Sequence, residues 1–259
     1  ALYLSHKVCK EVLMKSERLE NILNFIKQNK QVSVQKICKT FFYSEASVRR
    51  DLKSLADMNL IVRTYGGAML RQYDNSIQPF VIREQQAVPE KTTIAEKASS
   101  LIQDGDVIML DQSTITHKLV GFLSRLKDIT VFTNCLQSIN QLSNMGIKTY
   151  CIGGLLDAPS KAFIGSYAQD FVSTVYADIL FFSAKGLSKE GRISDPFQEN
   201  AVLRKTMIKH SKKKVFLCQT SKIDSLYAYD ICGLDEIDYI CSETTPPDYV
   251  YAQCKNVLV

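Results

Sequence analysis

Hydrophobic residues recur at helical spacing in three short segments near the start of the chain. Residues 16–28, SERLENILNFIKQ, predict a first helix with Ser16 as its N-cap, because the leucines and isoleucines fall on one face. A second helix is expected to start at Ser33. A third is expected to run from Ser44, whose hydroxyl can cap it, to about Met58.

A hairpin pattern follows the three predicted helices. Residues 59–70, NLIVRTYGGAML, place two short apolar runs around Gly66-Gly67, which predicts two antiparallel strands with a tight turn. Three short helices and a hairpin match the winged helix-turn-helix plan, in which the start of the third helix enters the major groove of DNA. We therefore expect a winged helix-turn-helix domain over 16–71.

From Lys91 onward the pattern alternates between helical and strand periodicity. The expected strands are 106–111, 129–134, 147–154, 178–186, 214–219 and 238–243, and the expected helices are 91–102, 114–126, 136–145, 168–176 and 198–211. This alternation predicts an α/β fold, with a mostly parallel sheet covered by helices on both faces. Residues 91–259 are therefore expected to form a second, larger domain.

Two segments lack sustained periodicity. Residues 72–90 contain two prolines and are interpreted as the interdomain linker, and residues 1–15 as an N-terminal extension. The extension mixes charged and apolar residues and does not resemble a signal peptide. Because the chain also lacks an uninterrupted apolar run of about 18 residues, we expect a cytoplasmic protein that does not associate with a membrane.

Charge is distributed unevenly between the two expected domains. Residues 1–71 contain 13 Lys+Arg and 6 Asp+Glu, a net +7, whereas residues 72–259 contain 19 and 21, a net −2; together these give the +5 of the whole chain. A basic unit attached to a nearly neutral one indicates that one end of the chain binds a polyanion.

The predicted third helix carries its charge on one side. Val48 and Leu52 share a face that must be buried, so Arg49, Arg50 and Lys53 project away from the core. An isolated Arg-Arg pair is usually a solvated helix face, but its place in the third helix of a basic winged unit favours contact with DNA. The residues expected to contact DNA are Ser33, Ser44, Ala46, Ser47, Arg49, Arg50, Lys53, Arg63, Tyr65, Gly66 and Gly67.

Polar residues follow the predicted strands of the larger domain. Ligands of parallel sheets bind beyond the carboxyl ends of the strands, and hydroxyls, glycines and lysines there suit a phosphate group. Each loop alone is weak evidence, since strand-to-helix loops are generally rich in Ser, Thr and Gly. The residues expected to bind an effector are Asp111, Ser113, Thr114, Thr133, Asn134, Gly153, Gly154, Lys185, Gly186 and Lys222.

The eight cysteines form no C-x-x-C pair, and the chain has three histidines, so no zinc site is expected. Reduced cysteines in apolar surroundings are the favoured interpretation, in keeping with a reducing compartment. No metal or other cofactor is predicted.

Three blocks resemble the N-terminal winged helix of the DeoR/GlpR family of bacterial transcriptional repressors. They are R-x-x-x-I (18–22), S-E-A-S-V-R-R-D-L (44–52) and L-I-V-R-T-Y-G-G-A (60–68). The loops of the larger domain resemble the effector domain of the same family, which is related in fold to ribose-5-phosphate isomerase and the CoA transferases. The resemblance implies operator DNA and a phosphorylated sugar as partners and a homo-oligomer, dimer or tetramer. It also implies repression of carbohydrate genes that the sugar relieves.

The chain departs from that family in three loops. It has D-Q-S-T-I (111–115) where the family usually has D-x-G-T-T, so Ser113 is expected to crowd a turn that relies on glycine. Lys185 and Gln219 stand where the family commonly has Asp. Two alternatives therefore stay open: a DNA-binding regulator whose ligand site is degraded, and a sugar-phosphate isomerase. The isomerase needs a positioned base, and the strand end offers Lys185 instead of a carboxylate.

Overall fold

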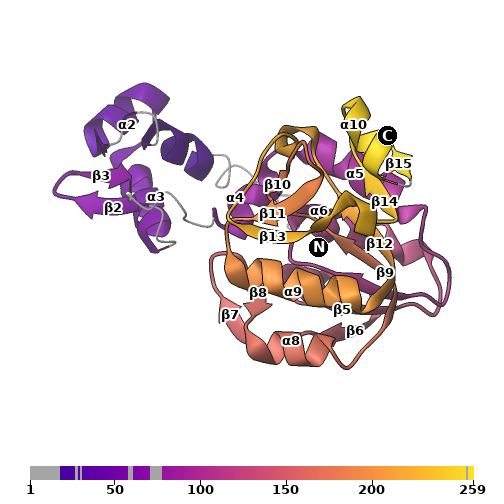
Figure 1. Ribbon diagram of the computed structural model, residues 1–259. Helices are drawn as coiled ribbons and strands as arrows, with labels where there is room; N and C mark the ends of the chain where they lie inside the picture. The colour runs from indigo at the N-terminus through magenta and orange to yellow at the C-terminus, as the bar shows by residue number, and fades with distance from the viewer. Residues whose placement is uncertain (1–17, 27–28, 30, 58–60, 71–77, 255) are drawn as a thin grey trace. The chain divides into compact units, whose positions relative to one another are not determined.

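The computed structural model describes residues 18–26, 29, 31–57, 61–70, 78–254 and 256–259 (Figure 1). The chain forms two compact units, which divide between Gln86 and Ala87. The expected extension over 1–15, the Ser16 cap and the first part of the expected linker lie outside the described residues.

The first unit contains the three expected helices. Residues 18–26 are helical, followed by α2 (Val34–Phe41) and α3 (Glu45–Asp57). The Ser44 hydroxyl accepts a hydrogen bond from Ser47 N at 3.3 Å, so the expected cap of the third helix is confirmed. The Ser33 hydroxyl accepts one from Lys36 N at 3.1 Å and caps the second helix, which was expected to start there. The three helices bury one hydrophobic core, which includes Leu19, Ile22, Leu23, Ile26, Val34, Ile37, Val48, Leu52 and Leu55.

The predicted hairpin is present and gains a third strand. Strands β2 (Ile61–Thr64) and β3 (Gly67–Leu70) are antiparallel, and β1 (Gln31–Ser33) pairs with the other edge of β3. The segment between the first two helices was not expected to contain a strand. A side chain at Gly67 would place its Cβ 2.3 Å from Val32 O, so glycine is what allows β1 to approach β3.

The segment expected as a linker is largely helical where it is described. Helix α4 (Phe80–Gln85) lies inside it, and α5 (Val88–Ser99) begins before the expected start at Lys91. Ile82 joins the hydrophobic core of the first unit, and Gln86 Nε2 donates to Glu20 Oε1 at 2.8 Å. The absence of periodicity was misleading because a six-residue helix is too short to show a repeat.

The larger unit alternates strands and helices as predicted. Its parallel sheet contains β4 (Val107–Leu110), β5 (Thr130–Thr133), β6 (Lys148–Cys151), β9 (Ala177–Phe182), β12 (Ser211–Leu217), β14 (Tyr239–Cys241) and β15 (Val257–Leu258). Its helices are α5, α6 (Thr114–Val120), α7 (Leu136–Asn144), α8 (Ser166–Val172), α9 (Gln198–Lys209) and α10 (Asp248–Gln253), with 3-10 turns η1 (Leu123–Arg125), η2 (Thr220–Lys222) and η3 (Leu234–Glu236).

The main sheet has the order β15-β14-β12-β9-β4-β5-β6, and all its described pairs are parallel. The chain moves from β4 outward to β5 and β6, then returns to β9 on the other side of β4. Such a reversal of direction opens a crevice at the carboxyl ends of the strands, where ligands of open α/β sheets bind. This topology therefore places the loops after β4 and β9 at the centre of the sheet's carboxyl edge.

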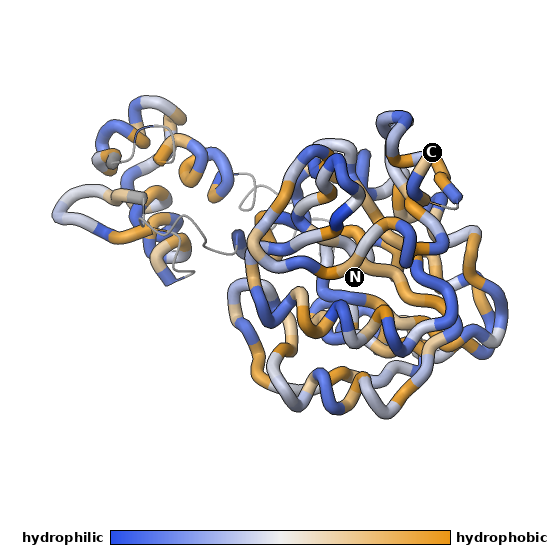
Figure 2. The backbone as a smooth tube through the Cα atoms, viewed as in Figure 1, coloured by the Kyte–Doolittle hydropathy of each residue, from blue (hydrophilic) through white to orange (hydrophobic). Residues whose placement is uncertain are grey.

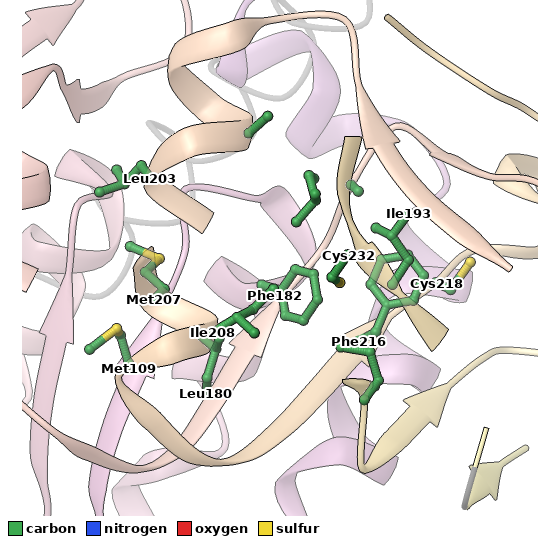
Figure 3. Packing of buried hydrophobic residues seen from close by; sticks show 14 of the residues in the cluster. Met109, Leu180, Phe182, Ile193, Leu203, Met207, Ile208, Phe216, Cys218 and Cys232 are labelled. Carbon is green, nitrogen blue, oxygen red and sulfur yellow. The ribbon is translucent and has the colours of Figure 1, made fainter. Parts of the chain in front are cut away.

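Hydrophobic cores lie on both faces of this sheet, because successive side chains of a strand point to opposite faces. Along β9, Leu180 and Phe182 belong to one core and Ile179 and Phe181 to the other. The first core packs against α8 and α9 and includes Phe216 and Met207 (Figure 3). The second packs against α5, α6 and α7. Hydrophobic residues are accordingly concentrated along the central strands (Figure 2).

Two small antiparallel sheets were not predicted. Strands β7 (Leu155–Asp157) and β8 (Ala162–Ile164) form a hairpin, and β10 (Gly186–Leu187), β11 (Arg192–Asp195) and β13 (Tyr229–Gly233) form a three-stranded sheet. With two to five residues each, these strands are too short to produce a clear alternation. The predicted strand 178–186 ends at Phe182, and of its remaining residues Gly186 belongs to β10 of the small sheet. Among the described helices, none has the length and hydropathy needed to cross a bilayer.

Candidate DNA-contact surface and effector site

The outward face of α3 carries the residues that the sequence assigned to DNA. Val48, Leu52 and Leu55 are buried in the core, whereas Ala46, Arg50 and Lys53 are exposed along the opposite side of the helix. This division follows from the helical repeat. The structure therefore leaves basic side chains available on the side that a winged helix presents to DNA.

An ion pair fixes the inner side of the same helix. Asp51 is almost fully buried, and its carboxylate accepts hydrogen bonds from Arg18 Nε at 2.5 Å and Arg18 Nη2 at 3.0 Å. The hydrogen bond with Asp51 raises the pKa of Arg18 above its normal value. Because a bidentate arginine–carboxylate pair has a defined geometry, it fixes α3 relative to the first helix. Both residues lie in the motifs quoted above, but their pairing was not predicted.

The two adjacent arginines of α3 are held by different groups. Arg49 donates to Glu45 Oε1 from Nε at 2.9 Å and from Nη2 at 2.6 Å. Arg50 Nε donates to Ala46 O at 3.4 Å, and Arg50 Nη2 to Ser47 Oγ at 3.5 Å. Both guanidinium groups therefore lie over the first turn of the helix, close to Ala46 and Ser47, which are expected to contact DNA.

The hairpin exposes some of its predicted contact residues and buries one. Arg63 and Tyr65 are exposed, and Gly66 adopts a left-handed backbone, φ 83°, in open space at the tip. Gly67 is buried and serves the close approach of β1 and β3, so its role is in packing rather than in the expected surface contact. Ser33 is exposed but its hydroxyl caps α2. Contact of these residues with DNA stays a prediction.

In the larger unit, the loops after four adjacent strands are connected by side-chain hydrogen bonds. Gln112 after β4 pairs with Asn134 after β5, Asp111 after β4 accepts from Ser183 N after β9, and Lys222 after β12 donates to Ser183 Oγ at 2.8 Å. The sheet order brings these loops together, because β12, β9, β4 and β5 are neighbours. Most of the predicted effector residues therefore gather at one edge of the sheet.

Asp111 is the centre of this arrangement and is fully buried. Its Oδ1 accepts from Ser113 N at 2.9 Å and from Thr116 Oγ1 at 3.0 Å, and its Oδ2 accepts from Arg204 Nε at 2.8 Å and Ser183 N at 3.2 Å. A carboxylate with four such partners has used its principal acceptor positions. Asp111 therefore organises the loop, which differs from the direct contact with an effector expected from the sequence.

Arg204 connects Asp111 to a second buried carboxylate. Its Nη1 donates to Asp195 Oδ2 at 2.8 Å, and Asp195 Oδ1 accepts from Phe197 N at 3.0 Å. Burial by itself lowers the pKa of Arg204, but the two carboxylates outweigh burial and raise the pKa above its normal value. Three charged side chains, from the loop after β4, from β11 and from α9, thus form one hydrogen-bonded unit.

Ser113 was expected to crowd a turn that needs glycine, but its backbone contradicts that reason. Its φ of −75° and ψ of 153° are extended values that any residue adopts, and its hydroxyl accepts from Thr116 N at 3.2 Å as the N-cap of α6. Thr114 is buried in the first turn of that helix. Serine therefore introduces no backbone strain at this position.

A row of amides crosses the edge of the sheet. Gln112 Nε2 donates to Asn200 Oδ1 at 2.9 Å, and Asn134 Nδ2 donates to Gln112 Oε1 and to Phe163 O, both at 3.0 Å. These two acceptors fix the orientation of the Asn134 amide. Within the described residues, the buried Asn134 Oδ1 has no hydrogen-bond partner. A buried acceptor without a hydrogen bond costs free energy, so this atom is suited to accept a hydrogen bond from a bound molecule.

The other predicted effector residues have mixed positions. Thr133 is buried and its Oγ1 accepts from Cys135 N at 3.2 Å. Gly154 and Gly186 have packing roles, because an added Cβ would lie 2.5 Å from Ile164 O and 2.4 Å from Ser225 O respectively. Lys185 is partly buried, and its backbone N–H donates to Ser194 O at 3.3 Å. Gly153 has open space around it.

Sequence reasoning missed Ser183, Asn200 and Arg204. Arg204 had a detectable signal, since it shares the core-facing spacing of Ala201 and Ile208 on α9, and a charged residue at such a position indicates a buried partner. The other two had no signal, because polar residues after a strand or at the start of a helix are common. Within the described residues, no group of three or more His, Cys, Asp or Glu side chains is arranged to hold a metal ion.

Family models match both units of the chain. Residues 18–73 match the DeoR-like helix-turn-helix domain, and residues 86–244 match the DeoR C terminal sensor domain.

Several curated proteins are similar in sequence over most of the chain. The HTH-type transcriptional repressor GlcR of Bacillus subtilis is 33% identical over 235 residues, covering 90% of each chain. The L-fucose operon activator of Haemophilus influenzae is 30% identical, covering 92% of this chain and 96% of the relative. The lactose phosphotransferase system repressor of Staphylococcus epidermidis is 28% identical, covering 88% and 92%.

Solved structures match less closely. The eIF2B delta structure from Chaetomium thermophilum has a TM-score of 0.46 and 15% identity, with 78% of this chain and 65% of that chain covered. A D-ribose-5-phosphate isomerase in complex with phospho-erythronic acid has a TM-score of 0.40 and 15% identity, with 52% and 54% covered.

Proposed function

The chain belongs to the DeoR family of transcriptional regulators, and from that premise we propose that it represses carbohydrate genes until a phosphorylated sugar binds its sensor domain. The protein would act in the bacterial cytoplasm. Its relatives are regulators of transcription and include both repressors and an activator, so the sign of regulation is part of the proposal.

The exposed face of α3 supports the DNA-binding part. Ala46, Arg49 and Arg50 lie in the first half of the helix, which enters the major groove in this class of fold. Arginine is suited to guanine O6 and N7, whereas Lys53, one turn further on, suits a phosphate. The exposed Arg63 and Tyr65 of the hairpin are placed for the backbone or the minor groove.

A homo-oligomer fits this mode of binding. Helix-turn-helix proteins bind two half-sites about one helical turn apart, so two winged units would contact a single operator. A ligand that changes the arrangement of the two units would then change operator affinity without touching DNA.

The main support for a sugar effector is the acceptor Asn134 Oδ1. This buried acceptor is unpaired among the described residues, and a hydroxyl of a polyol would satisfy it. Lys185 and Lys222 belong to neighbouring loops and supply positive charge for a phosphate. A sugar phosphate combines both groups in one molecule.

The two alternatives are disfavoured by specific observations. An isomerase would need an accessible base, and Asp111 is buried with four partners. The relatives are also regulators rather than enzymes. A degraded site was suggested by the altered 111–115 loop and by Lys185 and Gln219. Of these departures, Ser113 no longer supports it, because its backbone is unstrained and its hydroxyl caps α6.

The test is fluorescence anisotropy of the full chain on DNA from upstream of its own gene and on scrambled DNA. The measurement covers a salt series and a panel of sugar phosphates. We expect preferential, salt-sensitive binding that one sugar phosphate weakens. Equal affinity for the upstream and the scrambled DNA would refute the proposal that the protein recognises an operator sequence. Preferential binding that no sugar phosphate changes would refute the effector.

Matched variants separate the roles within α3. Arg49→Ala should lower operator binding more than binding to scrambled DNA, because it removes a base contact worth about 1–3 kcal/mol. Lys53→Ala should weaken binding to both DNAs alike. Equal losses on both DNAs for Arg49→Ala would contradict its assignment to a base edge. Asn134→Ala should abolish the effector response while leaving operator binding intact.

A further inference from the structure

An acidic residue begins the helix that is placed to enter DNA. Glu45 is the first residue of α3, and its side chain is 58% exposed. Its Oε1 accepts from Arg49 Nε and Nη2 at 2.9 and 2.6 Å, which forms an i, i+4 ion pair with a half-exposed arginine. Glu45 was absent from the predicted contact residues, because the sequence reasoning selected basic residues and small hydroxyls.

A carboxylate in this place has an electrostatic cost. DNA carries a dense negative charge, so an acid near the groove weakens binding to every sequence unless a base compensates it. Among base edges in the major groove, cytosine N4 is a donor from which glutamate accepts. Adenine N6 is also a donor, but the acceptor N7 lies beside it and repels a carboxylate. Guanine N7 and O6 and thymine O4 are acceptors, and these would repel the carboxylate.

The ion pair places a hydrogen-bond donor, Arg49, next to a hydrogen-bond acceptor, Glu45. The arginine fork uses Nε and one terminal nitrogen on Glu45, which leaves its other nitrogen directed elsewhere. The second carboxylate oxygen of Glu45 remains available, because both hydrogen bonds from Arg49 end on Oε1. One group can therefore donate to a guanine while the other accepts from a cytosine at a neighbouring position.

Building on the proposed function, we infer that Glu45 is a specificity-determining residue of the DNA surface. In the operator complex its free carboxylate oxygen accepts a hydrogen bond from a cytosine amino group, while Arg49 contacts an adjacent guanine. Glu45 favours cytosine by attraction and excludes guanine and thymine by repulsion at the same base-pair position.

The test is selection from randomised double-stranded DNA by the full chain, followed by sequencing of the bound pool. Four variants are compared with the wild type: Glu45→Gln, Glu45→Ala, Arg49→Ala and the control Asp57→Asn. Asp57 is exposed at the far end of α3, so its variant removes one negative charge from the same helix away from its start. Circular dichroism checks that each variant is folded.

Glu45→Gln should change the preference at one position from cytosine to adenine, because glutamine pairs with adenine N6 and N7. Glu45→Ala should remove about tenfold discrimination at that position and strengthen binding to random DNA. Asp57→Asn should change no positional preference, and Arg49→Ala should affect a different, adjacent position.

Several outcomes would overturn the inference while the proposed function stands. One is an unchanged positional preference in both Glu45 variants. Another is loss at the same position in Glu45→Ala and Arg49→Ala, which would show that Glu45 orients Arg49 and does not contact a base. If the wild-type chain selects no sequence at all, the proposed function itself fails.

Discussion

Replacement of Arg204 by methionine tests the buried charges beside the candidate effector site. The side chain of Arg204 is 6% exposed, and it donates to Asp111 and to Asp195, whose side chains are 0% and 3% exposed. Arg204→Met removes the cation and leaves two carboxylates in the interior. Their remaining partners are mostly neutral backbone N–H groups, such as those of Ser113 and Phe197.

The expected cost is about 3–5 kcal/mol, the usual penalty for removing one partner of a buried ion pair. The matched control is Arg192→Met. Arg192 makes a similar bidentate pair with Asp230, but both side chains are 44% exposed, so solvent screening limits the expected loss to about 0–1 kcal/mol.

Urea unfolding of the full chain measures the difference, followed by tyrosine fluorescence because the chain lacks tryptophan. Since the two units need not unfold together, each transition is fitted separately, and peptide hydrogen exchange assigns the affected one. In Arg204→Met we expect the backbone amides of residues 111–116 to lose protection from hydrogen exchange, because Asp111 holds this loop through its hydrogen bonds to Ser113 and Thr116. A loss of stability no larger than that of Arg192→Met would refute the reasoning.

Three further changes have expected outcomes. Gly186→Ala should destabilise the chain by about 1–3 kcal/mol in urea unfolding, because its Cβ would lie 2.4 Å from Ser225 O; an unchanged midpoint would contradict that contact. Phe42→Asn should stabilise the first unit by about 1 kcal/mol in thermal unfolding, since Phe42 is 93% exposed with φ 56°; a lower midpoint would show that the ring packs. Maleimide labelling with peptide mass spectrometry should modify exposed Cys151 in the native protein but not Cys218, whose burial raises its pKa to about 12; equal rates would contradict the burial.

Much of the fold could be predicted because its longer elements have strong periodicity. The third helix shows this well: Val48, Leu52 and Leu55 are buried, and Ser44 caps the helix as expected. The alternation of strands and helices in the larger unit is confirmed in the same way. A local pattern contains enough information where one face of an element is buried and the other is wet.

The remaining features depend on contacts between distant segments. Strand β1 forms because β3 offers it an edge, and α4 is held by burial of Ile82 in a core built from the other helices and the strands of the first unit. The roles of the residues at the candidate effector site were even harder to predict. Asp111 was expected to touch a ligand, but its pairing with Arg204 spans 93 positions and leaves no local trace. The sequence thus predicted that these residues lie in neighbouring loops at one edge of the sheet, but it could not predict their hydrogen-bond partners.

The position of Ile82 in the core of the first unit decides where this regulator can be cut and joined to another. A hybrid that ended its DNA-binding part at the hairpin would lose Ile82 and the bond from Gln86 to Glu20, and would expose apolar surface. A junction between Gln86 and Ala87 leaves the hydrophobic cores of both units whole. Exchange of sensors among relatives, by recombination in evolution or by design in the laboratory, should therefore succeed at that junction and fail at the end of the hairpin, after Leu70.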